Sequence, residues 1–115
     1  MMDTIDNIRA YFQDKLDRFG STPRGADWNS ATAQNNRFDQ LIKVIRPHAG
    51  YSILDFGCGY GALADYLSAI DRQFSLFVGY DILESMVEEA RHLHQQAAGK
   101  YLFTANFSEV PVVEY

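Results

Sequence analysis

The most constraining feature of this 115-residue chain is an apolar segment that runs directly into three alternating glycines. It reads Ile-Leu-Asp-Phe-Gly-Cys-Gly-Tyr-Gly over residues 53–61. Glycine has no side chain, so each of these positions lets the backbone turn sharply and approach a ligand closely. A helix that begins after such a turn directs unpaired backbone N–H groups toward whatever lies above it. The pattern predicts a strand, a ligand-binding turn at Gly57, Gly59 and Gly61, and a helix.

Two classes of cofactor fit this turn to different degrees. Dinucleotide-binding folds carry G-x-G-x-x-G or G-x-G-x-x-A after the first strand, and an acidic residue about 20 positions later. Gly57, Gly59 and Ala62 match that template loosely. Asp81 stands close to the required acidic position. Asp55, however, precedes the first glycine by two positions, where a dinucleotide-binding strand is usually apolar.

With Asp55 included, the segment reads D-x-G-x-G-x-G and resembles the first motif of the class I S-adenosylmethionine-dependent methyltransferases. The likeness continues in order along the chain. Residues 79–91 are similar to the family's G-x-D-x-S-x-x-M-x-x-x-A-R, with a helix one residue longer. Residues 106–111 are similar to its third motif, D-x-x-x-L-P, with Asn in place of Asp and Val in place of Leu. Residues 22–28 resemble the region that precedes the domain in some bacterial and archaeal members.

The resemblance implies an α/β fold, a Rossmann-like three-layer sandwich with helices flanking a parallel sheet. The family sheet has seven strands, and this chain supplies candidates for the first three, in the order 3-2-1. We therefore expect a partial sheet, truncated before the fourth strand. The chain would then be the N-terminal, cofactor-binding half of such a domain.

Within that half, residues 1–29 are expected to form an N-terminal helix and a lid or linker, and residues 30–115 the partial methyltransferase domain. Tyr11, Arg24 and Trp28 lie in the part that covers the cofactor in relatives. Aromatic rings there could screen the sulfonium through cation–π attraction. The alternative is that this segment is only a helix packed on the edge of the sheet.

Hydrophobic periodicity places the elements independently of the resemblance. Helices are predicted over residues 4–19, over residues 30–46, after the glycine turn (Leu63, Tyr66, Leu67 and Ile70 inward), and up to about Ala98 (Leu83, Met86, Val87, Ala90 and Leu93 inward). Strands are predicted over residues 51–56, 74–80 and 100–105. Strands that alternate with helices favour parallel pairing through right-handed crossovers.

The resemblance also implies S-adenosyl-L-methionine as the cofactor and assigns residues to it. In the family the glycine turn lines the methionine portion, which here implies contacts from residues 57–61, namely Gly57, Cys58, Gly59, Tyr60 and Gly61. Asp55 would reach the amino group of the methionine portion, directly or through water. Its alternative role is to accept bonds from nearby loop N–H groups.

Asp81 would accept hydrogen bonds from both ribose hydroxyls, because a carboxylate offers two oxygens to two adjacent donors. Alternatively, Asp81 and Glu84 form an N-cap and a capping box. Ile82 would pack on the adenine or belong to the core. Asn106 would accept a bond from the adenine amino group, without the charge assistance of Asp. Phe107 would pack beside it.

Neither the cysteine nor the histidines predict a further reactive site. Cys58 is expected to fill space in the turn. The alternative is a redox or nucleophilic role, which needs a lowered thiol pKa that a helix N-terminus could provide. His92 and His94 are two positions apart on a helix and point to different faces, so they cannot bind one metal as an i, i+4 pair would. No metal site is expected.

Composition narrows the classes of partner and location. The net charge of −5 argues against a broad nucleic-acid footprint. The single cysteine excludes an internal disulfide and a cysteine-based zinc site. No apolar run reaches the roughly 18 residues of a membrane span, and Asp3 and Asp6 are incompatible with a signal peptide. We expect a cytoplasmic protein with a small-molecule partner, without nucleic-acid or membrane partners.

The leading functional hypothesis is a methyltransferase that transfers the sulfonium methyl group to an unidentified acceptor, with proximity as a main source of catalysis. Acceptor-binding residues usually follow the fourth strand, so no catalytic residue is assigned and the isolated chain could be inactive. The alternatives are a catalytically incomplete binding or assembly module and an NAD(P)-binding oxidoreductase module. A bare first-strand edge predicts self-association, or a tail over residues 110–115 that folds back as a substitute strand.

Overall fold

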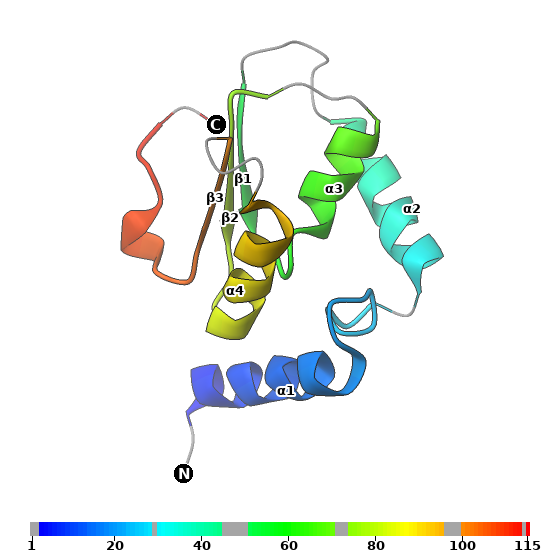
Figure 1. The fold of residues 1–115 in the computed structure, drawn as a ribbon, viewed down its shortest axis with the longest axis vertical. Coiled ribbons are helices and arrows are strands. Elements are labelled where there is room, and N and C mark those ends of the chain that lie inside the picture. The colour runs from blue at the N-terminus through cyan, green and yellow to red at the C-terminus, as the bar shows by residue number, and fades with distance from the viewer. Residues whose placement is uncertain (1–2, 29, 45–50, 71–73, 96–99, 114) are drawn as a thin grey trace.

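The chain folds into a short parallel sheet with helices packed against it, as the computed structural model shows (Figure 1). The structure describes residues 3–28, 30–44, 51–70, 74–95, 100–113 and 115. The elements in order are α1 (Thr4–Phe19), α2 (Ala31–Ile42), β1 (Ser52–Phe56), α3 (Ala62–Ala69), β2 (Leu76–Tyr80), α4 (Glu84–Leu93), β3 (Tyr101–Thr104) and the 3-10 helix η2 (Phe107–Glu109).

The sheet has the strand order β1-β2-β3 with both pairs parallel, so the predicted order 3-2-1 is confirmed. The register aligns Asp55 of β1 with Gly79 of β2, and Gly79 with Phe103 of β3. Gly79 is required here, because a Cβ at this position would lie 2.5 Å from the Phe103 ring. The carboxyl ends of the strands therefore sit at one common edge, which is where ligands bind in open α/β sheets.

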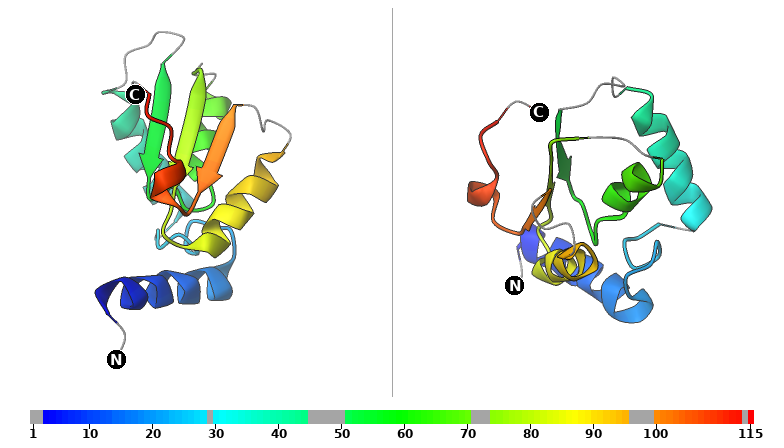
Figure 2. Two further views of the ribbon diagram at one scale, coloured as in Figure 1. Left: turned by 90° about the vertical axis from the view of Figure 1, so that its left-hand side faces the viewer. Right: turned by 45° about the horizontal axis from the view of Figure 1, so that its top comes forward.

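The helices divide unequally between the two faces of the sheet (Figure 2). α2, α3 and α4 lie on one face, and η2 with the C-terminal segment lies on the other. α1 and the loop that follows it lie beyond the carboxyl ends of the strands (Figure 2). The α/β Rossmann-like fold is confirmed, and the only helix that the described residues place on the second face is the short η2.

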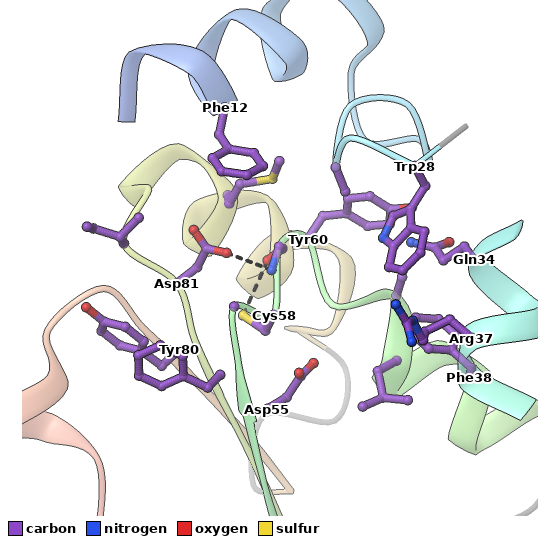
Figure 3. A pocket seen from close by; sticks show the side chains of 18 of the residues that line it. Phe12, Trp28, Gln34, Arg37, Phe38, Asp55, Cys58, Tyr60, Tyr80 and Asp81 are labelled. Carbon is purple, nitrogen blue, oxygen red and sulfur yellow. Dashed lines mark hydrogen bonds between the residues drawn. The ribbon is translucent and has the colours of Figure 1, made fainter. Parts of the chain in front are cut away.

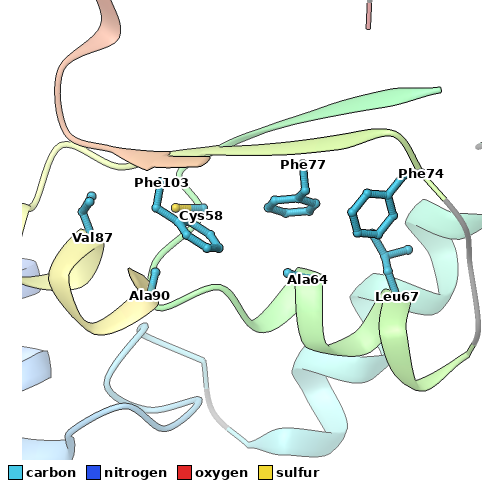
Figure 4. Close-up of a cluster of buried hydrophobic side chains, with 8 residues drawn as sticks. All are labelled: Cys58, Ala64, Leu67, Phe74, Phe77, Val87, Ala90 and Phe103. Atoms are coloured by element: carbon cyan, nitrogen blue, oxygen red, sulfur yellow. The ribbon is translucent and has the colours of Figure 1, made fainter. Parts of the chain in front are cut away.

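The core fills the space between the sheet and helices α3 and α4 (Figure 4). β2 is the central strand and supplies Phe77 to this core, where its side chain is fully buried. The other buried residues of this cluster come from β3, α3, α4 and the connecting loops. They are Cys58, Ala64, Leu67, Phe74, Val87, Ala90 and Phe103. Burial of this apolar surface holds α3 and α4 against the sheet, and thereby fixes the loops at the carboxyl ends of the strands.

The N-termini of the first two helices follow the sequence closely. Asp3 caps α1 by accepting a bond from the Asp6 N–H, and Ser30 caps α2 in the same way through the Ala33 N–H. α1 has the predicted bounds. α2, however, ends at Ile42 and is followed by two turn residues, Lys43 and Val44, whereas the predicted end at residue 46 lies outside the described residues.

Several other predicted boundaries need correction. The strands are shorter by one to two residues at their ends, as is usual for predicted bounds. α4 ends at Leu93, whereas the sequence predicts an end near Ala98, which lies outside the described residues. Ile70 and Leu93 were expected to face the core, but they are 41% and 50% exposed because each stands at the end of its helix.

The described part of the C-terminal tail does not form a strand beside β1. Residues 110–113 and 115 have no strand structure, so that alternative is wrong for the described part of the tail. Within the described residues, β1 pairs only with β2 and its other edge is free of strand partners. Self-association through this edge stays a prediction. None of the helices that the structure describes is long and apolar enough to cross a bilayer.

Candidate cofactor-binding site

The glycine turn connects β1 to α3 and has the backbone conformation that the sequence predicts. Gly57, Gly59 and Gly61 have φ values of +84°, +56° and +92°, a region that side chains strongly disfavour. A Cβ on Gly57 would meet nothing within 4 Å, which leaves open space above the turn. A Cβ on Gly61 would lie 2.5 Å from the His94 ring, so this glycine permits close packing on the opposite side.

Most N–H groups of residues 57–61 are satisfied within the protein, before the helix begins. The N–H groups of Gly57 and Cys58 both donate to the Tyr80 carbonyl, at 2.7 and 2.9 Å. The Gly59 N–H donates to Asp81 Oδ2 at 2.9 Å, and the Gly61 N–H donates to the Cys58 carbonyl at 3.1 Å. These bonds fix the turn to the end of β2. Among the described residues, no acceptor engages the N–H groups of Ala62, Leu63 and Ala64 in the first turn of α3, as expected for a helix N-terminus.

Asp81 follows β2 and holds the loops on both sides of the site. Its Oδ1 accepts a bond from the Leu83 N–H at 2.9 Å, while Oδ2 accepts the Gly59 N–H. The predicted capping box with Glu84 is wrong, because the N-cap of α4 is Leu83 and no side chain caps this helix. Each carboxylate oxygen can accept a second bond. Asp81 therefore retains the capacity to bind two hydroxyl groups.

Asp55 lies at the end of β1 and faces the same space as Asp81. Burial, with a contribution from the negative charge of Asp81, raises the pKa of the Asp55 carboxyl to about 6. Among the described residues, no hydrogen bond or ion pair involves the Asp55 side chain. A buried carboxylate without a partner is costly in free energy. The position therefore favours a ligand that brings a positive charge to Asp55.

A cavity of about 560 Å³ joins these groups (Figure 3). Seven of the residues predicted to bind the cofactor line it, namely Asp55, Gly57, Cys58, Gly59, Tyr60, Asp81 and Ile82. This volume lies within the usual range for small-molecule sites, and the walls are largely apolar with few polar groups. Asp55 and Asp81 thus share one cavity, which the resemblance requires.

Three predicted residues lie outside the lining of this cavity. Gly61 stands behind it, at the start of α3. Asn106 caps η2 by accepting bonds from the Ser108 N–H and hydroxyl. Phe107 is 54% exposed and packs against Phe56 and Tyr80, with ring centroids 6.0 and 5.4 Å away. Contacts of Asn106 and Phe107 with the adenine stay predictions.

The other wall of the cavity comes from the chain that precedes the sheet, and the sequence argument largely missed it. It consists of Phe12 of α1, Ala26 and Trp28 of the following loop, and Gln34, Arg37, Phe38 and Leu41 of α2. The α2 residues stand at i, i+3, i+4 and i+7, so one face of the helix lines the cavity. This spacing was the available signal. Of the proposed lid residues, Trp28 lines the cavity and Tyr11 and Arg24 do not.

Cys58 is buried below the turn, with its Sγ directed toward the Gly59 carbonyl. Burial and the nearby charges of Asp55 and Asp81 raise the pKa of the thiol, so the thiolate is strongly disfavoured. The helix N-terminus therefore does not activate this cysteine, and the redox or nucleophilic alternative is unsupported. Cys58 is a packing residue that also lines the cavity.

His94 is a buried polar residue whose role the sequence did not reveal. Its Nδ1 lies 2.7 Å from the Ala90 carbonyl oxygen, and its Nε2 lies 2.8 Å from Asp65 Oδ1. Both partners are acceptors, so both ring nitrogens must carry a proton to make both bonds. The hydrogen bond to Asp65 raises the pKa of His94, although burial opposes this. The imidazolium thus links the end of α4 to the start of α3.

Comparison with known proteins agrees with this description. A family model described as "Methyltransferase domain" matches residues 54–114, which is more than half of the chain. The chain therefore belongs to the methyltransferase domain family, whose methyl donor is S-adenosylmethionine. A comparison with curated protein sequences finds no match.

Several solved structures share the fold. Phosphoethanolamine N-methyltransferase 1 of Haemonchus contortus, solved with phosphoethanolamine and S-adenosylhomocysteine, has a TM-score of 0.65 and 14% identity over 96% of this chain and 24% of that chain. YcgJ of Bacillus subtilis has a TM-score of 0.54 and 24% identity over 69% and 33%. The [4+2]-cyclase SpnF has a TM-score of 0.57 and 17% identity over 76% and 32%.

These identities are low, so the structural matches show the fold alone. The chain spans between a quarter and a third of the length of these three solved chains. One of these proteins is an N-methyltransferase and another is a [4+2]-cyclase, so one fold serves different chemistries. The residues of the cavity itself must therefore carry any argument about function.

Proposed function

We propose that the cavity binds S-adenosylmethionine and that this chain provides the cofactor-binding part of a methyltransferase for a small-molecule acceptor. One observation carries the proposal: Asp55, the glycine turn and Asp81 all line one cavity of suitable size. When bound, the cofactor supplies a methyl group on a positively charged sulfur. The methyl group would pass to a nucleophile of the acceptor.

The residues present fit the parts of this molecule. Asp81 would accept bonds from the ribose hydroxyls through the lone pairs that Gly59 and Leu83 leave free. Asp55 would pair with the amino group of the methionine portion, which supplies the positive charge that this buried carboxyl lacks. Gly57 leaves space where a side chain would obstruct the ligand. Ile82 and Met86 would pack against the flat faces of the adenine ring.

Calorimetric titration of the purified chain tests the proposal, with S-adenosylhomocysteine and NADH as the two ligands. We expect binding of S-adenosylhomocysteine alone. Binding of NADH alone would instead support an oxidoreductase module. Binding of neither would contradict the proposal and favour an assembly module.

A pair of variants shows whether the binding occurs at this cavity. Asp81→Asn should weaken S-adenosylhomocysteine binding by about 10- to 100-fold, which is the usual size of a hydrogen bond to a charged group. Asp14→Asn is the matched control, because Asp14 is exposed on α1 and forms only a surface ion pair with Arg18. Equal affinities for the two variants would place the ligand elsewhere.

A further inference from the structure

His94 is a buried polar side chain that lies outside the cavity lining but directly behind the glycine turn. It stands at the C-cap of α4 and is only 8% exposed. A Cβ built on Gly61 would lie 2.5 Å from the Cε1 atom of the His94 ring. The same ring packs on Phe103 and Tyr101 of β3, with ring centroids 5.1 and 5.2 Å away. The ring therefore contacts both the glycine turn and the sheet.

Both ring nitrogens of His94 face acceptors. Nδ1 lies 2.7 Å from the carbonyl oxygen of Ala90, which also accepts the backbone N–H of His94 at 3.1 Å. Nε2 lies 2.8 Å from Oδ1 of Asp65. A neutral imidazole has one N–H, so it can donate to one of these oxygens and turns a lone pair toward the other. The two bonds therefore exist together only while the ring is protonated.

Loss of the proton would break the bond to Asp65 and keep the bond to Ala90. The Ala90 carbonyl is fixed within α4, whereas the Asp65 side chain is 62% exposed and can turn toward water. The neutral ring would thus remain attached to its own helix. It would no longer hold α3.

The bond to Asp65 holds the beginning of α3. Gly61 is the N-cap of this helix, and in the described part of the chain no side-chain hydrogen bond caps it. Asp65 stands in the first turn of α3, and Ala62 and Leu63 of the same turn line the cavity. The bond between His94 and Asp65 therefore fixes part of the cavity wall from outside the cavity.

The other groups near the ring that can carry a charge engage different partners. The Tyr101 hydroxyl lies 3.1 Å from Ser68 Oγ, and Arg91 of α4 donates from Nε to the Phe103 carbonyl at 3.0 Å. Burial, with the nearby charges of Asp55 and Asp81, raises the pKa of the Cys58 thiol in the turn, which is therefore neutral. Among the residues that the structure describes, Asp65 is thus the only ionised group bonded to the ring.

We propose that His94 is a positioning residue for the cofactor turn: its protonated ring holds the start of α3 against the end of α4, and so sets the affinity of a cavity that it does not line. The inference rests on the proposed function of that cavity. A ligand that needs the ordered turn binds the protonated form of the chain more tightly than the neutral form. By linkage, the bound ligand raises the pKa of His94.

Nuclear magnetic resonance of the histidine ring protons measures this linkage in the wild-type chain. We expect saturation with S-adenosylhomocysteine to raise the pKa of His94. His92 is exposed on the same helix and is the internal control, because its ring signals should respond to pH in the same way with and without the ligand. A pKa of His94 that the ligand does not change would overturn the proposal.

Calorimetric titration with S-adenosylhomocysteine between pH 6.5 and 9 tests the same link through variants. The affinity of the wild type relative to His94→Gln isolates His94, because Asp55 and the amino group of the ligand titrate in both chains. We expect this ratio to be at least about threefold larger at pH 6.5 than at pH 9. Asp65→Asn should move the fall in affinity to lower pH, since it removes the charge that favours the protonated ring. Asp14→Asn is the control for the loss of one surface carboxylate, because Asp14 pairs with Arg18 on α1.

The outcomes separate this inference from the function on which it rests. If the wild type binds S-adenosylhomocysteine and its affinity relative to His94→Gln is the same at every pH, His94 has only a packing role. The proposal is then wrong, and the proposed function stands. If the wild type binds the ligand at no pH, the proposed function fails and this inference falls with it. Thermal melting shows whether His94→Gln is folded at each pH; if it is not, the titration of His94 in the wild type and in Asp65→Asn decides.

Discussion

Asp55 gives the sharpest test of the relation between stability and binding in this chain. Replacing it with Asn keeps the shape of the side chain and removes the negative charge of this partly buried group. Because burial raises the pKa of the carboxyl from 3.8 to about 6, the folded chain disfavours the ionised form. We therefore expect Asp55→Asn to stabilise the ligand-free protein at neutral pH, and to weaken its binding of S-adenosylhomocysteine.

The size of the effect follows from the pKa. One pKa unit corresponds to about 1.4 kcal/mol, so a rise from 3.8 to about 6 lowers the free energy of unfolding by about 2–3 kcal/mol at pH 7. The sign follows from proton binding. Between pH 4 and 6 the folded state holds this proton more tightly than the unfolded state, so raising the pH destabilises the wild type. The gain in the free energy of unfolding of Asp55→Asn over the wild type should be absent below about pH 4 and complete above about pH 6.

Urea unfolding of the wild type and Asp55→Asn at a series of pH values from 3.5 to 8 measures this difference. Asp14→Asn is the control for the general effect of one charge on a chain of net charge −5. A difference between wild type and Asp55→Asn that does not change with pH would refute the argument. So would a variant that is less stable than the wild type at pH 7.

Three further measurements test the packing around the turn. The stabilising interaction of protonated His94 with Asp65 should be complete below about pH 6.5 and lost as the pH rises through the higher pKa of the folded state. The free energies of unfolding in urea of the wild type and His94→Gln should therefore converge at high pH. A difference that stays constant with pH would contradict this. Gly57→Ala should lower the free energy of unfolding by about 1–2 kcal/mol because of its positive φ alone. Gly61→Ala should lower it more, because the added Cβ would also meet the His94 ring. A higher melting temperature for Gly61→Ala than for Gly57→Ala would be inconsistent with this packing. Cys58 should react slowly with iodoacetamide in the folded chain and quickly in urea, whereas fast labelling of the folded chain would show that the thiol is accessible.

Local patterns were sufficient to predict much of the fold. Hydrophobic periodicity predicts α1, three alternating glycines predict the turn, and strands that alternate with helices predict the parallel sheet. Each of these patterns depends on residues close together in sequence. The ends of α2 and α4 were less predictable. His94 is the C-cap of α4, and its side chain contacts Asp65, which lies 29 residues earlier and cannot be read from the helix itself.

The site was predictable only where it follows the motifs. Asp55 and Asp81 come together because parallel strands end at one edge of the sheet. The Tyr80 carbonyl accepts the N–H groups of Gly57 and Cys58 through a tertiary contact, so the sequence could not show that these two donors are already bonded. The α2 wall was missed for a related reason. Phe38 and Leu41 have the spacing of an ordinary core face, and periodicity does not distinguish a core from a cavity.

The segment ahead of the sheet has a thermodynamic consequence. Its first helix rests on the domain through Phe12 and Leu16, which pack against the cluster of Tyr60, Leu83 and Met86. If this segment detached, the three-stranded sheet could remain folded, but the cavity would lose the wall that Phe12, Ala26 and Trp28 form. Affinity for any occupant and attachment of the N-terminal region are therefore linked equilibria, so each must strengthen the other.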